Sequence, residues 1–305
     1  MAVIGVQTCG LDRLYGVDGA YREMKAAGFG AADVNLNDHY SYRDIVTGQR
    51  SPVFSGPLEE SLAVFKPYRD AAEKYGVLNA QAHAPFPSWV AGRDEQNDYL
   101  ITVLERSVEI CGFLGCPRLV VHPFFGGYDE SLTAEAEWDL NMDRYARLIP
   151  AARKHGVTIC LENMFIGHNR KLYQACCSDF TVACRYVDEL NALAGQELFG
   201  FCLDTGHALL LGKDIRQVIR QLGQRIKCFH LHDNNGIEDQ HLAPYMGVMD
   251  WDRFAQGLRD IGYRGHLSFE TESAVSRAFD PELVPELLRL IAASGRLFAR
   301  RAGME

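Results

Sequence analysis

Six short apolar segments of the sequence end in side chains that bind metals or move protons. These ends are Gln81-Ala82-His83, Val121-His122, Leu161-Glu162, Leu203-Asp204-Thr205-Gly206-His207, His230-Leu231-His232 and Phe269-Glu270. Six of the ten histidines lie at these ends or, as His241 does, in the segment after His232. Because a random distribution would spread histidines over helices and loops, this concentration predicts one shared site.

Four of these residues, Glu162, Asp204, His230 and Glu270, come from four successive apolar segments. Three clustered carboxylates repel one another and lose hydration, so without a compensating cation they would take up protons. No Lys or Arg occupies these segment ends. A bound divalent metal is the simplest compensation, and three oxygen ligands with one nitrogen favour Mn²⁺, Mg²⁺ or Co²⁺ over a structural zinc.

Such a centre suits proton transfer next to a carbonyl group. A metal chelated by a carbonyl and the adjacent hydroxyl stabilises an enediolate as its charge develops. A nearby carboxylate removes the proton, and the same or an opposed group returns it. Return to the neighbouring carbon isomerises a sugar, whereas return to the opposite face epimerises it.

Elements must bring these residues together, and the sequence repeats one unit: an apolar run, a polar loop and a stretch of helical periodicity. The apolar runs are Ala2–Gln7, Ala31–Leu36, Leu78–His83, Arg118–His122, Val157–Glu162, Phe199–Asp204, Ile226–His230 and His266–Glu270. The amphipathic stretches are Tyr21–Ala27, Glu60–Tyr75, Asp98–Leu114, Ala134–His155, Phe180–Ala194, Asp214–Leu222, Trp251–Ile261 and Pro281–Arg300. The runs lack clean alternation, as strands buried on both faces do.

Eight units of about 38 residues each predict an α/β fold, the (β/α)8 TIM barrel, as a single domain over residues 1–305. A doubly wound open sheet is the main rival. It would call for a Gly-rich phosphate turn after the first strand, and residues 7–12 contain no GxGxxG. In a barrel, the site lies at the carboxyl ends of the strands.

The sequence resembles the xylose-isomerase-like TIM barrels, the superfamily of sugar (phosphate) isomerases and epimerases and endonuclease IV. The residues that carry the resemblance are Leu161-Glu162-Asn163, residues 203–207, residues 230–234, Asp239-Gln240-His241, Trp251 and residues 261–270. The resemblance implies that Glu162, Asp204, His230 and Glu270 bind the metal and that the two glutamates exchange the proton. It implies for His207 a contact with a ligand or the substrate.

Two positions depart from the ketose epimerases of that superfamily. Those enzymes carry a further Glu where this chain has His168, and an Arg where it has Gly236. Both positions contact substrate in that subfamily, so a different sugar, sugar phosphate or cyclitol is open. We predict substrate contacts for a further set of residues. This set is His83, His122, His207, His232, Asp239, His241 and Trp89.

Three alternatives remain open. A metal-dependent lyase or hydrolase of sugar-like substrates would use the same centre. An endonuclease IV-like phosphodiesterase would bind three zinc ions through the four ligands and a further set of residues. That further set is His83, His122, His207, Asp239 and His241. Against it, the loop after the second strand, residues 37–44, is more acidic than basic. A non-catalytic sugar-binding barrel would bind its ligand without metal.

Composition sets the remaining limits. The 305 residues are 47% apolar and carry a net charge of −9, which excludes a disordered chain and disfavours a broad nucleic-acid surface. No apolar stretch is long enough for a membrane span, and the first residues lack a signal peptide's pattern, so a cytoplasmic protein is expected. Nine cysteines without a CxxC pair are expected to be reduced. The resemblance is compatible with a homo-oligomer.

Overall fold

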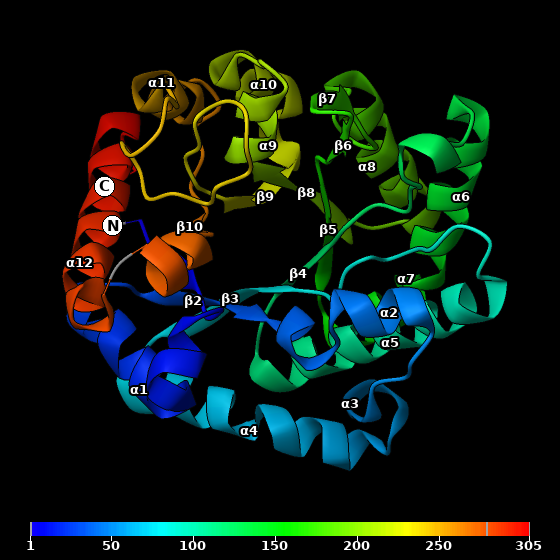
Figure 1. Ribbon diagram of the computed structural model, residues 1–305, viewed down its shortest axis with the longest axis horizontal. Coiled ribbons are helices and arrows are strands. Elements are labelled where there is room, and N and C mark those ends of the chain that lie inside the picture. Colours follow the sequence, from blue (N-terminus) through cyan, green and yellow to red (C-terminus); the bar gives the residue numbers. More distant parts are fainter. Residues whose placement is uncertain (1, 279, 305) are drawn as a thin grey trace. The chain divides into compact units, whose positions relative to one another are not determined.

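The computed structural model describes residues 2–278 and 280–304 (Figure 1). Its main sheet has eight strands in the order β10-β1-β2-β3-β4-β5-β8-β9. The strands are β1 (Ile4–Gln7), β2 (Ala31–Asn35), β3 (Leu78–His83), β4 (Arg118–Val121), β5 (Thr158–Glu162), β8 (Phe199–Asp204), β9 (Ile226–His230) and β10 (Leu267–Phe269). These bounds confirm the eight predicted strands to within a few residues.

The sheet closes on itself. β1 pairs in parallel with β10 and with β2, and β4 pairs in parallel with β3 and with β5. Beyond the end of β9, Leu231 forms a parallel bridge with Phe269 of β10. Nearly every strand residue is buried, as strands covered on both faces must be. The fold is the predicted α/β TIM barrel.

Helices follow the strands along the chain. They are α1 (Leu11–Ala27), α2 (Tyr42–Thr47), α3 (Pro52–Ser55), α4 (Leu58–Tyr75), α5 (Asp94–Leu114), α6 (Ala134–Arg147), α7 (Ile149–His155), α8 (Phe180–Ala194), α9 (Thr205–Leu210), α10 (Ile215–Leu222), α11 (Trp251–Asp260) and α12 (Val284–Ala302). Short 3₁₀ turns lie at Leu36–His39, Tyr128–Glu130, Gly223–Arg225 and Pro281–Leu283, and a π turn at Ala274–Ala278. Among the described residues, no helix is both long and apolar enough to cross a bilayer.

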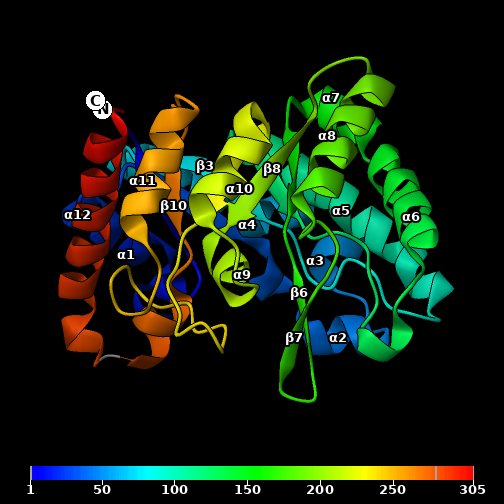
Figure 2. The same ribbon diagram turned by 90° about the horizontal axis from the view of Figure 1, so that it is seen from above.

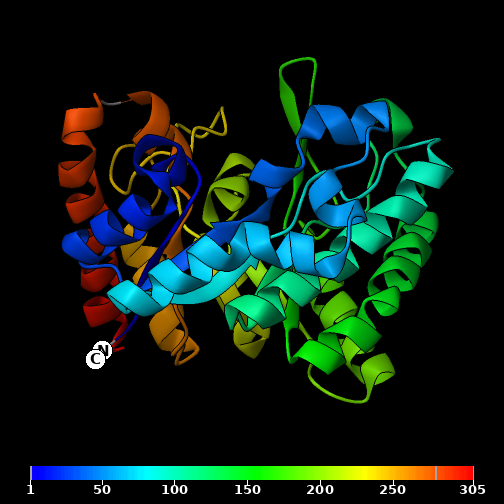
Figure 3. The ribbon, with the colours of Figure 1, turned by 90° about the horizontal axis from the view of Figure 1, so that it is seen from below.

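Two segments differ from the sequence-based expectation. The helix expected over 134–155 is two helices, because Pro150 has no N–H to donate and so starts α7 instead of continuing α6. An unexpected antiparallel hairpin follows β5, formed by β6 (Phe165–His168) and β7 (Lys171–Gln174). Asn169 and Arg170 at its tip have positive φ, as a two-residue hairpin turn requires. The hairpin protrudes in Figure 2, where β6 and β7 are labelled, and as a green loop in Figure 3.

The chain divides into two compact units, which are described one at a time. The first comprises the residues up to Val34, Pro67–Ala80 and the residues from Cys202 onward; the second comprises Asn35–Lys66 and Gln81–Phe201. In the first unit, α12 runs beside α11 (Figure 1), and Trp251 stacks on Phe298 with ring centroids 4.8 Å apart.

The second unit has its own aromatic core. The Phe124 ring lies edge-on to Tyr145 at 5.1 Å, and Trp138 of α6 stacks on Tyr186 of α8 at 4.3 Å. The Tyr145 hydroxyl donates to the Val121 carbonyl at the end of β4. This packing holds β4 against the helices that cover it.

Candidate metal site

The carboxyl ends of β1, β2, β9 and β10 gather four buried polar side chains in the first unit. Gln7 Nε2 donates to Glu270 Oε1 at 2.8 Å. His230 Nδ1 lies 3.4 Å from Glu270 Oε2, and His230 Nε2 lies 3.3 Å from Asp33 Oδ2. The unit thus brings together two of the predicted ligands, His230 and Glu270.

Asp204, the predicted ligand at the end of β8, contacts His232. The two Asp204 carboxylate oxygens lie 3.1 and 3.0 Å from His232 Nε2. Asp204 also accepts from the backbone N–H of His207, because it caps α9. His232 is fully buried behind this carboxylate. A Cβ on Gly206 would lie 1.9 Å from His232 Cε1, so a glycine is needed at position 206.

Asp239 and His241 enter the same group of side chains from the loop after β9. Asp239 Oδ2 lies 3.1 Å from His241 Nε2 and 3.4 Å from His207 Nε2. On the other side of its ring, His241 Nδ1 lies 3.1 Å from Glu272 Oε2. The His241 and His232 rings stack with centroids 4.1 Å apart. The predicted contacts His207, His232, Asp239 and His241 therefore lie together.

Electrostatics in this cluster follow from the alternation of carboxylates and imidazoles. Burial alone would lower the pKa of His241, but Glu272, Asp239 and Glu270 raise that pKa well above its ordinary value. Burial alone would raise the pKa of Asp239, but hydrogen bonds from His207 and His241 hold it far below its usual range. A metal bound here would take the place of the protons that now balance these carboxylates.

A single carboxylate, Asp233, holds the loop that carries Asp239 and His241. It accepts from the backbone N–H groups of Asn234, Tyr245 and Met249 and from the Trp251 indole, the last three at 3.0–3.1 Å. Backbone bonds between Asp233 and Leu242 pin the middle of the loop. The loop is therefore ordered although several of its apolar side chains are exposed.

The second unit places three other predicted residues together. His83 Nε2 and His122 Nε2 are 2.9 Å apart, and Glu162 Oε2 lies 3.2 Å from His122 Nε2 and 3.9 Å from His83 Nε2. All three are buried at the ends of β3, β4 and β5. The Phe86 ring lies 4.4 Å from the His122 ring. Trp89 is half-buried in the loop after β3.

The donor set fits a divalent ion. Within the first unit, ligand atoms of Asp204, His207 and His232 lie within 4.8 Å of one another, as do those of His232, His241 and Glu270. Imidazole nitrogens and carboxylate oxygens are common ligands of divalent ions in proteins. The buried His, Glu and Asp groups indicate a divalent metal site, and the identity of the ion stays a prediction.

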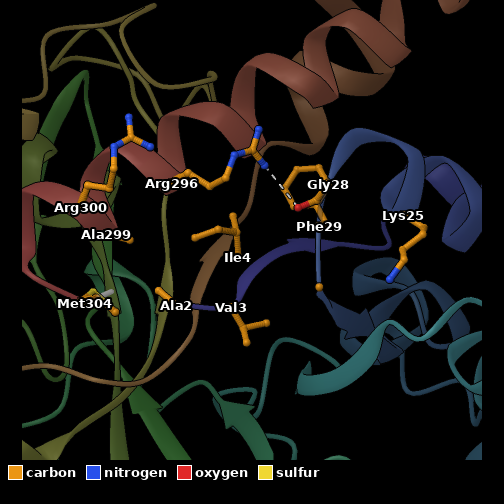
Figure 4. Close-up of a pocket in the computed structure, with 11 residues that line it drawn as sticks. Ala2, Val3, Ile4, Lys25, Gly28, Phe29, Arg296, Ala299, Arg300 and Met304 are labelled. Carbon is orange, nitrogen blue, oxygen red and sulfur yellow. Dashed lines mark hydrogen bonds between the residues drawn. The ribbon is translucent and has the colours of Figure 1, made fainter.

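A separate cavity lies at the other end of the strands in the first unit, near the start of β1 (Figure 4). Its volume is about 560 Å³, and its lining residues come from β1, the α1–β2 turn and α12. Lys25 and Arg296 donate to carbonyls of Gly76 and Gly28, which close helices α4 and α1. These cations complement the negative ends of helices, which accounts for their position without a ligand.

Three residues of the cluster were not predicted: Gln7, Asp33 and Glu272. Gln7 ends the apolar run Ala2–Gln7, whereas Asp33 lies inside the run Ala31–Leu36. Neither residue forms a known metal-binding motif with its neighbours in the sequence. Gln7 and Glu270, whose side chains share a hydrogen bond, lie 263 positions apart in the chain. Glu272, two residues after Glu270, could have been identified from strand alternation.

Comparison with known proteins identifies the family that this sequence matches. Residues 22–293 match the family described as "Xylose isomerase-like TIM barrel". An uncharacterized protein of Sinorhizobium fredii is 24% identical over 60% of this chain and 56% of its own length. A "Probable endonuclease 4" of Cenarchaeum symbiosum is 34% identical over 44% of this chain and 43% of its own length. The chain thus spans about half the length of these curated relatives.

Solved structures share the fold over the whole chain. A D-allulose 3-epimerase from Methylomonas sp. superposes with a TM-score of 0.70 at 18% identity, covering 99% of this chain and 98% of the other. The IOLI protein, solved with a zinc atom, also has a TM-score of 0.70, at 17% identity, covering 98% and 99%. At these identities the likeness establishes the barrel.

Proposed function

We propose that this chain, which belongs to the xylose isomerase-like TIM barrel family, is a divalent-metal-dependent isomerase or epimerase of a small carbohydrate. The observation that carries the proposal is the buried set of carboxylates and imidazoles at the carboxyl ends of the barrel strands. That is where barrel enzymes place their chemistry. A solved neighbour named D-allulose 3-epimerase is consistent with it.

The proposed metal ligands are Glu162, Asp204, His230 and Glu270, each at or next to the end of a strand. A bound divalent ion, Mn²⁺ in the first instance, supplies a Lewis acid for a sugar carbonyl and its neighbouring hydroxyl. Three carboxylates and one imidazole give a hard, mostly oxygen ligand set, which suits Mn²⁺, Mg²⁺ or Co²⁺ better than a structural zinc.

The proposed chemistry uses Glu162 and Glu270 as the groups that remove and return the proton next to the carbonyl. Gln7 donates to Glu270 Oε1, which holds this carboxylate in one orientation while leaving Oε2 to act. His83 and His122 lie beside Glu162 and are proposed to bind substrate hydroxyls, and half-buried Trp89 to cover a sugar face. We propose the same role in substrate binding for His207, His232, Asp239 and His241.

Deuterium exchange tests the proposal. The protein, loaded with Mn²⁺, is incubated in D₂O with a panel of ketoses and aldoses, and incorporation next to the carbonyl is followed by NMR. We expect exchange with the wild type and at least a 10³-fold loss in Glu162→Gln and Glu270→Gln, since each removes an essential acid/base group. Glu105→Gln on α5 is the control. Wild-type exchange rates in both variants would sink the assigned roles.

A second candidate function is a zinc-dependent phosphodiesterase. The contacts of His83 and His122 with Glu162, and of His207 and His241 with Asp239, are those that a three-metal centre would need. The alignment with a "Probable endonuclease 4" also favours it. Metal content separates the two functions: about one equivalent supports the isomerase or epimerase. Two to three zinc equivalents with cleavage of abasic DNA would support the phosphodiesterase.

A further inference from the structure

The His230 imidazole lies between two carboxylates that approach its two ring nitrogens. Nδ1 is 3.4 Å from Glu270 Oε2, and Nε2 is 3.3 Å from Asp33 Oδ2. His230 and Asp33 are fully buried. If Glu270 binds the metal, Nδ1 faces the ion and Nε2 faces Asp33.

A neutral imidazole carries one N–H, and the nitrogen that binds a metal must be the other one. An ionised carboxylate can only accept a hydrogen bond, so Asp33 favours the tautomer with the proton on Nε2. That tautomer leaves the Nδ1 lone pair directed toward Glu270. We propose that Asp33 is a positioning residue: it fixes the tautomer and ring orientation of His230 and so raises the affinity of the metal site. This inference rests on the proposed function.

Strand register gives the arrangement a second support. Gln7 and Asp33 are direct partners in the parallel pairing of β1 with β2. Gln7 Nε2 donates to Glu270 Oε1, while Asp33 faces His230. Two residues at paired positions of β1 and β2 therefore contact Glu270 and His230, one each. Partners of this kind behind metal ligands typically change metal affinity by about 10–100-fold when removed.

The test measures metal binding and needs no substrate. Metal-free protein is titrated with Co²⁺ and, separately, Zn²⁺ in competition with a chromophoric chelator, and the Co²⁺ absorption spectrum is recorded. We expect Asp33→Ala to bind each ion about 10–100-fold more weakly and to shift the Co²⁺ bands. Asp33→Asn should fall between, because its amide oxygen can face the Nε2–H group but carries no charge. Asn79→Ala, which removes a buried acceptor of the Tyr21 hydroxyl in the same unit, should leave affinity unchanged.

A double-mutant cycle shows whether Asp33 acts through His230. In a His230→Ala background, Asp33→Ala should weaken metal binding by less than about 3-fold further, because the imidazole it positions is gone. Additive losses would overturn the proposal. So would Asp33→Ala and Asp33→Asn variants that bind Co²⁺ as tightly as the wild type. A wild type that binds neither ion would instead contradict the proposed function itself.

Thermal unfolding of the metal-free variants separates positioning from support of the fold. Asp33→Asn keeps the shape of the buried side chain and an acceptor oxygen beside His230, so the metal-free variant should stay folded. If metal-free Asp33→Asn is unfolded at the assay temperature while Asn79→Ala is folded, Asp33 supports the fold and the positioning role is overturned.

Discussion

At the scale of single residues, Gly206 is the tightest point of the site. Because a Cβ there would lie 1.9 Å from His232 Cε1, Gly206→Ala must push His232 away from Asp204. We expect a loss of about 1–3 kcal/mol in unfolding free energy, as for other overpacked positions, together with weaker Co²⁺ binding. Urea unfolding and Co²⁺ titration measure both. Gly167→Ala on β6, where a Cβ would make an ordinary contact of 3.9 Å with Leu172, should stay within about 0.5 kcal/mol.

Gln7 supplies a second prediction at this scale. Gln7→Leu removes the donor to Glu270 Oε1, so the orientation of this buried carboxylate is less fixed. We expect Mn²⁺ affinity to fall by about 10-fold, measured by chelator competition. The matched control is Gln96→Leu, whose amide donates to the Tyr40 hydroxyl instead of to a proposed ligand. Equal effects of the two substitutions would contradict a specific role for Gln7.

These residues also show how far the sequence could predict the site. The sequence predicts a shared site for Glu162, Asp204, His230 and Glu270 because charged residues rarely end buried strands, and their role as ligands stays a prediction. Gln7 and Asp33 could not be predicted, since their meaning depends on which strands become neighbours when the sheet closes. His232 stays a predicted substrate contact, and its packing against Asp204 could not be predicted from the sequence because it depends on the small size of Gly206.

At the scale of elements, α6 carries a half-buried carboxyl, that of Glu137, in its first turn. Burial raises the pKa of Glu137, and a hydrogen bond from Cys176 opposes this in part. A raised pKa in the folded state means that the ionised form is disfavoured by folding. The contribution of Glu137 to the free energy of unfolding is therefore greatest below the ordinary pKa of Glu. It is lost as the pH rises through the pKa that Glu137 has in the folded protein.

Glu137→Gln should therefore stabilise the protein at pH 7, and the gain should vanish near pH 4. Urea unfolding at the two pH values measures this. Glu135→Gln, at an exposed position of the same turn, loses only the favourable interaction with the helix end and should cost about 0.3–1 kcal/mol at pH 7. A Glu137→Gln gain that persists unchanged at pH 4 would rule out ionisation as its cause.

The elements themselves were predicted well where the apolar runs are continuous. The break between α6 and α7 was missed because helical periodicity continues through Pro150. The β6–β7 hairpin was missed because its two strands are only four residues each and only half-buried. Hydrophobic periodicity indicates that one face of an element is buried against a core, and no residue of this hairpin is fully buried.

At the scale of the whole molecule, metal binding and folding should be coupled. Ligands that bind the folded state alone raise stability by about 2.7 kcal/mol at 100 times their Kd. We expect Mn²⁺ or Co²⁺ to raise the thermal midpoint of chelator-treated protein, measured by circular dichroism, and EDTA to reverse it. Glu270→Gln should lose most of this rise, and Glu105→Gln should keep it. Midpoints that do not respond to either ion would argue against a built metal site.

The hydrogen bonds that Asp233 accepts fix its loop at several points, which limits where the sequence of the loop can change. The chain from Asn234 to Met249 leaves the barrel and returns to it at points fixed by one carboxylate, with Trp251 anchoring the exit. Ile237 and Glu238 are exposed between these points, whereas Asp239 and His241 of the same loop belong to the site. Exchange of Ile237 and Glu238 would therefore change the surface beside the site while Asp233 keeps the loop in place.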